Sequence, residues 1–380
     1  MKLSNIKLLL FLFPFFVSCT ATKNQPSNEK LIVKTKTGEL AILINEGSNR
    51  HFSWRDIKPS QNKLKWDLSF YETSEKVIVK SDIDSVEFIM KNHSSKMVQF
   101  DFGNDSTVDV QFISDDFKTQ EIQFDSNNGI GYQVKYQETP SKYLKELEKK
   151  YPMDLKGENK SDTETVLEVL HWVGSRWKHN GSNSPSKSDA ITILDEVNEG
   201  QRFPCFAFAI VLRDQLSVLG YKARTIYLKT ADAATSNYPS GHVATEVYLD
   251  DLEKWAYVDG QFNAMPMVND IPLNAVEFQT ALTNNYKNVI VKTLNTEPVY
   301  KNNFNDFIYP YLYYIETSLD NRYEKDKRFK IDGKRNMMLV PLGADNLKKT
   351  KFYGSNIDYC VYTNSLEDFY AKPNIENKDI

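Results

Sequence analysis

Three residues in the second half of the chain have the types and the order that nucleophilic catalysis needs: Cys205, His242 and Asp259. A thiol becomes a nucleophile when a histidine accepts its proton, and a carboxylate can hold that histidine in the productive orientation. Cys205 follows Pro204, and proline is common at the first position of a helix. We therefore expect Cys205 in the first turn of a helix, where the helix dipole favours a thiolate. The alternative is that Cys205 packs as a small hydrophobic residue.

The spacing of His242 and Asp259 predicts that they are neighbours on a β-hairpin. An alternating run from His242 to Leu249 is followed by four turn residues and a second run from Lys254 to Asp259. If Leu249 lies opposite Lys254, His242 and Asp259 become diagonal neighbours on one face of the hairpin. Glu246 lies on the same face, so it is a rival candidate for orienting the histidine.

The segments around these residues resemble motifs of the transglutaminase-like superfamily, which includes transglutaminases, peptide N-glycanases and bacterial cysteine peptidases. The resemblance covers residues 163–265. It implies an α+β fold with a papain-like core, in which a helix with the cysteine at its N-terminus packs on an antiparallel sheet. It also implies acyl transfer through a thioester, with Cys205 as nucleophile, His242 as general base and acid, and Asp259 as orienting residue. Four segments carry it: Phe-Pro-Cys205-Phe-Ala-Phe-Ala, Leu219-Gly-Tyr-Lys-Ala-Arg224, Gly241-His242-Val-Ala-Thr-Glu-Val and Lys254-Trp-Ala-Tyr-Val-Asp259.

Gln201 is the candidate for an oxyanion-stabilising side chain, because papain-like enzymes use a glutamine upstream of the cysteine. The alternatives are that Gln201 is a loop residue and that the backbone N–H of Cys205 is the main donor. Trp172 and Trp177 are candidates for the upstream tryptophan of some relatives, although helix-core packing explains both. Residues 232–240 run directly into His242 and read either as a lid over the site or as an ordinary exposed loop.

We predict no metal site and no cofactor. His171 and His179 have no cysteine or carboxylate at metal-ligand spacing, and His51 and His93 stand alone. Nucleic acid is not an expected partner either. Lys and Arg total 47 against 51 Asp and Glu, which gives a net charge of −4 and no excess of basic residues to neutralise phosphates.

The first 19 residues resemble a bacterial lipoprotein signal. Lys2 and Lys7 precede an apolar run over residues 8–17, which is too short for the ~20 residues of a membrane-spanning helix. The run ends at a cysteine, Cys19, which the resemblance makes the lipidated residue. The alternative is an ordinary secretory signal with a chance cysteine. Residues 20–30 are polar and read as a flexible tether, so we expect an exported protein anchored in the bacterial cell envelope.

The remaining chain divides into three predicted parts. Short alternating runs rich in β-branched and aromatic residues predict a β-rich domain over residues 31–140, with strands at 31–33, 39–44, 86–90, 97–102, 107–113 and 121–124. A catalytic domain over residues 141–300 follows, with helices at 163–177, 189–197 and from about 204, then strands at 223–229, 242–249 and 254–259. Residues 301–380 read as a mixed extension packed on this core.

The composition contains only three cysteines, and Cys360 raises the question of a disulfide. It lies in an alternating run, so a buried packing role is expected and a bond to Cys205 is not. Such a bond would consume the nucleophile.

These observations favour an exported lipoprotein that hydrolyses an amide or peptide bond through a cysteine thioester. Its partners would be a peptide or other amide-containing substrate and, through Cys19, a lipid membrane. A protein-cross-linking transglutaminase would also need a site that accepts lysine, and the sequence contains no recognisable one. A non-catalytic binding or scaffolding module on the same fold is the second alternative.

Overall fold

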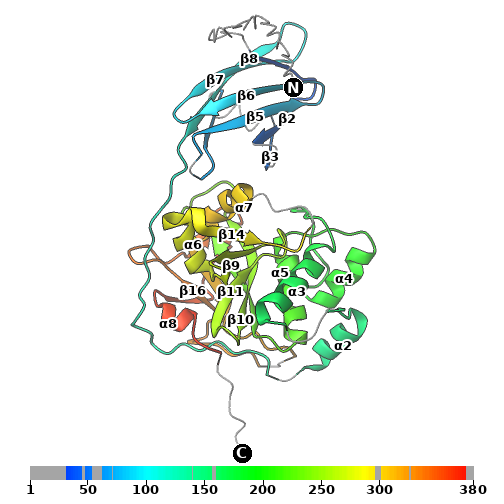
Figure 1. The fold of residues 1–380 in the computed structure, drawn as a ribbon, viewed down its shortest axis with the longest axis vertical. Helices are drawn as coiled ribbons and strands as arrows, with labels where there is room; N and C mark the ends of the chain where they lie inside the picture. Colours follow the sequence, from blue (N-terminus) through cyan, green and yellow to red (C-terminus); the bar gives the residue numbers. More distant parts are fainter. Residues whose placement is uncertain are drawn as a thin grey trace, which may run out of the picture.

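The computed structural model describes residues 31–44, 48–53, 62–70, 72–138, 140–155, 160–295, 301–324 and 327–373. It contains a small all-β part followed by a larger part in which helices and sheets are mixed (Figure 1). The expected α+β class with a preceding β-rich domain is therefore confirmed. The lipoprotein signal at 1–19 with Cys19, and the tether at 20–30, lie outside the described residues.

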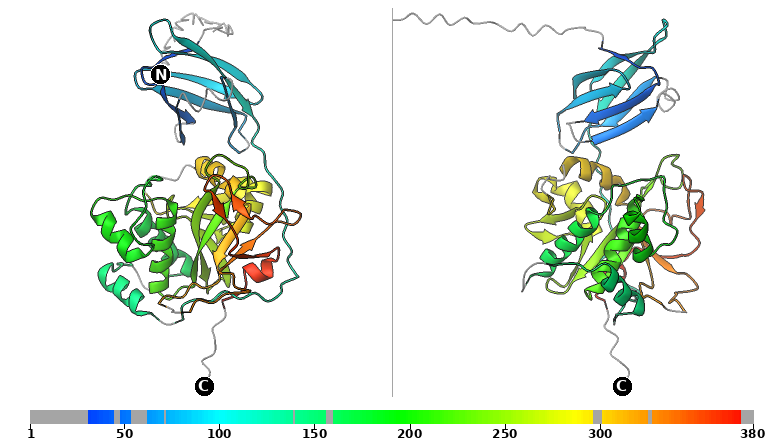
Figure 2. Two further views of the ribbon diagram at one scale, coloured as in Figure 1. Left: turned by 180° about the vertical axis from the view of Figure 1, so that it is seen from behind. Right: turned by 90° about the vertical axis from the view of Figure 1, so that its right-hand side faces the viewer.

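The first part is a sandwich of two four-stranded sheets (Figure 2). Its core is made by inward-facing residues of both sheets, such as Val79, Phe88, Phe100 and Phe112, because alternate residues of each strand point to the same side. One sheet has the order β1 (Leu31–Lys34), β7 (Ser95–Asp101), β8 (Thr107–Asp115) and β4 (Lys63–Asp67). The other has the order β3 (Ser48–Ser53), β2 (Glu39–Ile44), β5 (Ser74–Ser81) and β6 (Ser85–Lys91).

The sandwich ends at Asp115, earlier than the boundary expected at residue 140. The strand expected over residues 121–124 does not form, and the chain instead runs along the second part as an extended segment (Figure 1). Isolated bridges join Asp125 to Ser365 and Lys135 to Asp320, so this segment belongs to the second part by its contacts. Apolar and polar residues alternate in this segment because one side of it packs on the second part. The same alternation occurs in a strand that pairs within a sheet, so the pattern alone does not distinguish the two.

A six-stranded sheet is the centre of the second part. Its order is β11 (Lys254–Val258), β10 (Gly241–Leu249), β9 (Ala223–Lys229), β15 (Tyr314–Ser318), β16 (Asn336–Leu339) and β19 (Cys360–Thr363). Three of the six strands therefore come from residues 301–380. That segment completes the central sheet, which differs from the expected extension packed on a finished core. The cause is long-range pairing of β15 with β9, which no local pattern specifies.

Helices cover parts of both faces of this sheet (Figure 2). On one face α5 (Cys205–Val218) packs on β9 and β10, and three further helices surround it: α2 (Lys142–Lys150), α3 (Asp162–Gly174) and α4 (Ala190–Asn198). The other face carries α6 (Ala275–Asn284), α7 (Lys301–Ile308), η2 (Tyr286–Asn288) and η3 (Tyr309–Tyr311). The smaller elements are β12 (Met265–Val268), β13 (Ile271–Pro272), β14 (Val289–Lys292), β17 (Lys349–Thr350), β18 (Ser355–Asn356) and α8 (Leu366–Phe369).

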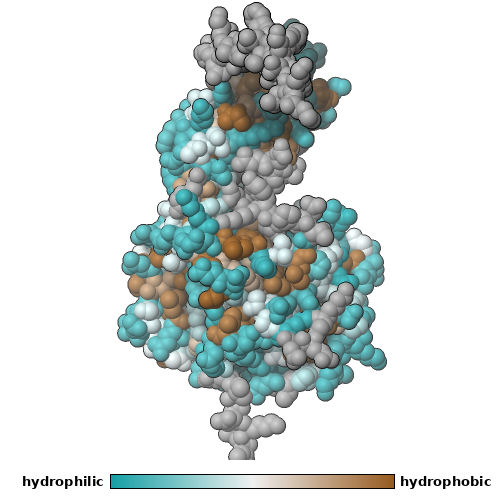
Figure 3. Space-filling view, in the orientation of Figure 1, coloured by the Kyte–Doolittle hydropathy of each residue, from teal (hydrophilic) through white to brown (hydrophobic). Residues whose placement is uncertain are grey.

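The surface in the orientation of Figure 1 is mostly hydrophilic, with hydrophobic residues in small groups rather than one continuous patch (Figure 3). Among the described residues, no helix has the length and apolar composition to cross a membrane.

Candidate active site

Cys205 is the first residue of α5. Pro204 precedes it as the N-cap in an extended conformation, with φ −78° and ψ −177°, and provides no side-chain cap. The first N–H groups of a helix have no partner within the helix, and the helix dipole gives this end a partial positive charge, so Cys205 lies at an end that favours an anion. The sequence analysis placed Pro204 inside the helix; it lies one position earlier, and Cys205 takes the first position.

Local geometry fixes where α5 begins and ends. At its C-terminus Gly220 adopts φ +90°, and the N–H groups of Gly220 and Tyr221 bind the carbonyls of Ser217 and Leu216. This arrangement satisfies the last carbonyls of the helix and requires the freedom of a glycine. The helix is joined to β10 by the Thr245 hydroxyl, which donates to the carbonyl of Ala209 at 3.1 Å. The position of the thiol therefore follows from contacts of the whole helix.

The β10–β11 hairpin has the predicted register: Leu249 pairs with Lys254, and Thr245 pairs with Val258. His242 and Asp259 consequently lie near each other on one face. His242 Nε2 lies 2.8 Å from Asp259 Oδ2, and both side chains are buried, with exposed fractions of 2% and 0%. Glu246, the rival candidate, instead binds the guanidinium of Arg224 at 2.7 Å.

Four groups surround the Asp259 carboxylate. Besides His242, the Tyr257 hydroxyl donates to Oδ2 at 2.9 Å, and the backbone N–H groups of Gln261 and Phe262 donate to Oδ1 at 3.1 and 3.2 Å. Burial, followed by the nearby Asp259 charge, raises the pKa of Tyr257 well above its usual value, so this phenol keeps its proton and donates it. A buried carboxylate with this many donors is held in one position and suits the role of orienting a histidine.

Aromatic rings pack around the His242 imidazole. Phe307 approaches it edge-on with 5.3 Å between ring centroids, and Tyr311 lies at 6.1 Å. Burial disfavours the imidazolium, but the Asp259 carboxylate outweighs burial and, with a smaller contribution from Cys205, raises the pKa of His242. The arrangement thus favours a protonated His242.

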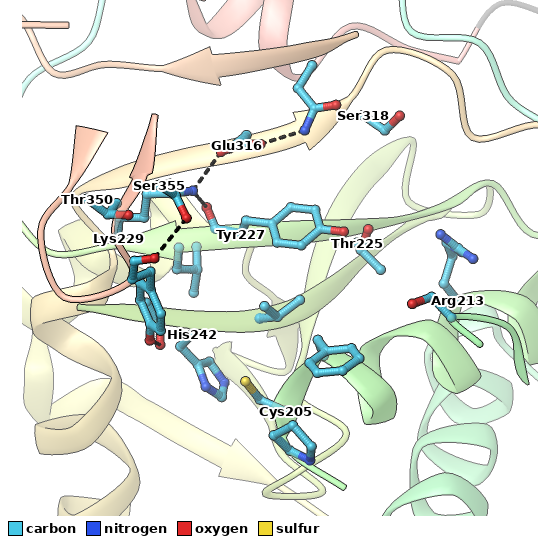
Figure 4. A pocket seen from close by; sticks show the side chains of 18 of the residues that line it. Cys205, Arg213, Thr225, Tyr227, Lys229, His242, Glu316, Ser318, Thr350 and Ser355 are labelled. Atoms are coloured by element: carbon cyan, nitrogen blue, oxygen red, sulfur yellow. Dashed lines mark hydrogen bonds and ion pairs between the residues drawn. The ribbon is translucent and has the colours of Figure 1, made fainter. Parts of the chain in front are cut away.

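Cys205 and His242 point toward each other across the end of the sheet (Figure 4). The interaction with Cys205 is one of the causes that raise the pKa of His242. Because Nε2 binds Asp259, Nδ1 is the nitrogen left for the thiol. The structure therefore brings all three predicted residues together in the order cysteine, histidine, aspartate.

A cleft of about 1170 Å³ opens from these residues. Cys205 is partly exposed to it, whereas Asp259 lies behind His242 and out of contact with solvent. Residues 232–240, which precede His242, border the cleft through Pro239. Ala233 in this segment is buried, and its carbonyl accepts a hydrogen bond from the Lys351 N–H at 3.0 Å.

Gln201 is not brought to the site. Its side chain is exposed, does not line the cleft, and accepts a hydrogen bond from the Asn183 amide at 3.1 Å. The expectation failed because residues 201–204 lead away from the helix start as a loop. Trp177 stacks on Phe208 in the core, with 4.0 Å between ring centroids, and Trp172 stacks with the Arg176 guanidinium.

His171 and His179 lie near the site but take no part in the Cys205–His242–Asp259 arrangement. His171 Nδ1 lies 3.2 Å from the amide nitrogen of Asn263, and His179 lines the cleft. Burial, and then the charge of His242, lower the pKa of His179, which favours its neutral form. Within the described part of the chain, no group of three or more His, Cys, Asp or Glu side chains could hold a metal ion.

Cys360 is a free thiol, buried among hydrophobic residues of β16 and the loops that follow it. Cys205 is also free, so the two are not joined. Burial, followed by the charge of Glu316, raises the pKa of Cys360 and keeps it protonated.

Three residues that contact His242 or Asp259 were not predicted from the sequence. Tyr257 shares a strand face with Asp259 two residues later, so the alternation could have identified its phenol as a partner. Phe307 and Tyr311 come from α7 and η3, and no signal in the sequence connects these elements with His242.

No family model and no curated protein matches the chain. A solved structure from Cytophaga hutchinsonii, described as a "Putative Cysteine Protease", is similar over 60% of this chain and 73% of its own. The two are 14% identical, with a TM-score of 0.26, which is too low to establish a common fold.

Proposed function

We propose that the protein is a cysteine-dependent acyl transferase that hydrolyses an amide or peptide bond, and that it belongs to the transglutaminase-like superfamily. The observation that carries the proposal is the buried His242–Asp259 pair facing a partly exposed thiol at a helix N-terminus. Each element of this arrangement has a chemical role. The dipole of α5 and the imidazolium stabilise a thiolate, and the free N–H of Cys205 is suited to receive an oxyanion.

The reaction would proceed in two halves. The Cys205 sulfur attacks the carbonyl carbon, the C–N bond breaks, and the proton on His242 passes to the departing amine. Neutral His242 then takes a proton from water, whose oxygen attacks the thioester and releases a carboxylic acid and the Cys205 thiolate. Asp259 stabilises the imidazolium that re-forms and holds the ring in place.

Acylation by p-nitrophenyl acetate tests the chemistry without knowledge of the natural substrate. The wild type should release p-nitrophenol over many turnovers and carry a transient acetyl group on Cys205, detected by mass spectrometry. His242→Ala should lose turnover, and Cys205→Ala should lose both the adduct and the turnover. A wild-type protein with an intact fold that forms no adduct would overturn the proposal and favour a non-catalytic binding module.

A cross-linking transglutaminase remains the second enzymatic candidate, because the same acyl-enzyme can react with an amine in place of water. Adding a primary amine such as monodansylcadaverine during turnover distinguishes the two. We expect hydrolysis to dominate, with little amide product; predominant amide formation would assign the protein to cross-linking.

We further propose that the chain is exported and held at the bacterial cell envelope by a lipid on Cys19. The support is the sequence of residues 1–19 alone, in which a short apolar run ends at a cysteine.

A further inference from the structure

The cleft extends beyond the thiol along the central sheet, beside α5. Alternate residues of β9 and β15 form its floor, including Thr225, Tyr227 and Ser318, while α5 packs on β10 and on part of β9 (Figure 4). The volume of about 1170 Å³ exceeds the ~300–1000 Å³ of typical small-molecule sites, so the cleft has room for several residues of an extended chain.

The far end of this cleft is strongly cationic. Five lining residues there carry positive charge: Arg213, Arg322, Arg328, Lys330 and Arg335. Among the described residues, two carboxylates pair with this set, Asp214 with Arg213 and Asp320 with Arg322. Five cations against these two carboxylates leave three positive charges, in a protein whose overall charge is −4. A sixth lining cation, Lys229, pairs with Glu316 and lies opposite Gly241, at the end of the cleft near the thiol.

The cationic side chains are fixed in place by their neighbours. Arg322 makes a two-pronged contact with Asp320, each bond 2.9 Å long, and the Arg335 guanidinium stacks 4.2 Å above the Tyr359 ring. Arg328 is half-exposed and lies 4.0 Å from Asp320, so it shares one carboxylate with Arg322. Pre-positioned cations lose little entropy when they bind an anion, and guanidinium groups match the geometry of a carboxylate.

We infer that this end of the cleft binds acidic side chains of an extended polypeptide whose scissile bond lies at Cys205. The inference rests on the proposed function and names the substrate class of the same site. A polypeptide fits because side chains alternate along the floor strands, so that successive residues of an extended chain can contact successive side chains of the cleft. The excess positive charge selects acidic residues.

Binding by the Cys205→Ala protein tests the inference without requiring catalysis. The probes are three ten-residue peptides that are acetylated and amidated to remove terminal charges: repeats of Ala-Glu, Ala-Gln and Ala-Lys. Calorimetry should show that the Ala-Glu peptide binds at least tenfold more tightly than the other two at low salt. The preference should vanish in 1 M NaCl, where the screening length falls to ~3 Å. Equal affinity for all three peptides would overturn the inference.

Matched variants locate the binding surface. The double variant Lys330→Gln/Arg335→Gln should weaken Ala-Glu binding about fivefold. Lys36→Gln/Lys96→Gln, with the same change in net charge on the sandwich, should leave it unchanged. Equal weakening by both pairs would show a non-specific charge effect, and tighter binding of an oligogalacturonate of equal charge would contradict the assignment to a polypeptide.

The outcomes separate this inference from the proposed function. Acyl transfer from p-nitrophenyl acetate with equal binding of the three peptides overturns the acidic subsite alone. Selective binding without any acyl-enzyme overturns the enzyme and leaves the cleft as a binding site for acidic chains.

Discussion

Among single residues, Asp259 determines whether the buried imidazole of His242 carries a proton. Burial alone would favour a neutral imidazole, and the carboxylate reverses this preference by raising the pKa of His242. The leaving amine takes this proton, so activity should decline on the alkaline side only when the pH passes the raised value.

Asp259→Asn should therefore lower turnover and move the alkaline limb of the pH profile toward ~6.5, the ordinary pKa of histidine. The amide keeps the shape of the side chain but removes the charge. The pH profile of hydrolysis of an amide substrate such as a peptide p-nitroanilide provides the measurement, because its leaving amine must take the proton from His242. An alkaline limb in the variant that coincides with that of the wild type would show that Asp259 does not act through His242.

The same residues show which parts of the site can be predicted from the sequence. Cys205, His242 and Asp259 could be selected because their types and order fit one chemistry, and the two hairpin residues were placed by a period of two. The position of Gln201 could not be predicted in this way, because it lies in a loop and no residue spacing specifies the direction of that loop. The ring contacts of Phe307 depend on a helix some 60 residues away, for which the sequence contains no distance information.

Among the elements, a buried ion pair stabilises the hairpin four residues along β10 from His242. Arg224 on β9 and Glu246 on β10 are 1% and 0% exposed, and their atoms approach to 2.7 Å. The Arg224 guanidinium also stacks 4.2 Å from the Trp255 ring on β11. The pair therefore joins three neighbouring strands and supports the register that brings His242 to Asp259.

Glu246→Gln should lower the free energy of unfolding by about 3–5 kcal/mol, since it leaves a buried guanidinium without its counter-charge. It should leave the alkaline limb of the activity profile where it is in the wild type. Glu87→Gln, which removes an exposed pair with Lys76 on the sandwich, should cost about 0–1 kcal/mol. Chemical denaturation measures both. A shift of the limb in Glu246→Gln would mean that Glu246, and not Asp259, orients the histidine.

Helices and strands were predicted well where apolar residues recur with a regular spacing, and poorly where a strand pairs with another that is distant in the sequence. The hairpin and α5 follow from alternation and from helical spacing with a terminal glycine. By contrast, β15 joins the sheet by pairing with β9, which lies far away in the chain, and β16 and β19 add to the sheet beside it. The cationic end of the cleft lies on these strands and their connections, so it could not be predicted from the sequence.

At the scale of the whole molecule, the β-sandwich contacts the second part close to the site. Phe70, which follows β4, stacks on Tyr286 with 4.8 Å between ring centroids and meets Tyr309 edge-on at 5.2 Å. Tyr309 belongs to η3, the element that also contains Tyr311 beside His242. The sandwich thus packs against the element that supports the histidine.

Attachment to the membrane should depend on Cys19. We expect Cys19→Ser to yield soluble protein or an unprocessed precursor, because the apolar run before it is too short to span a bilayer. Cell fractionation with detection of the chain measures this, and Cys360→Ser serves as the control that retains attachment. Normal processing and membrane retention of Cys19→Ser would contradict lipidation.

Alkylation of Cys205 by iodoacetamide, compared between the wild type and His242→Ala at about pH 6, measures whether the thiol is activated by His242. The wild type should be labelled at least about tenfold faster, because the imidazolium of His242 stabilises the reactive thiolate. Cys360, buried and protonated, should remain unlabelled in both proteins and provides an internal reference. Equal rates for Cys205 in the wild type and in His242→Ala would show that the thiol is not activated by the histidine and would contradict the proposed site.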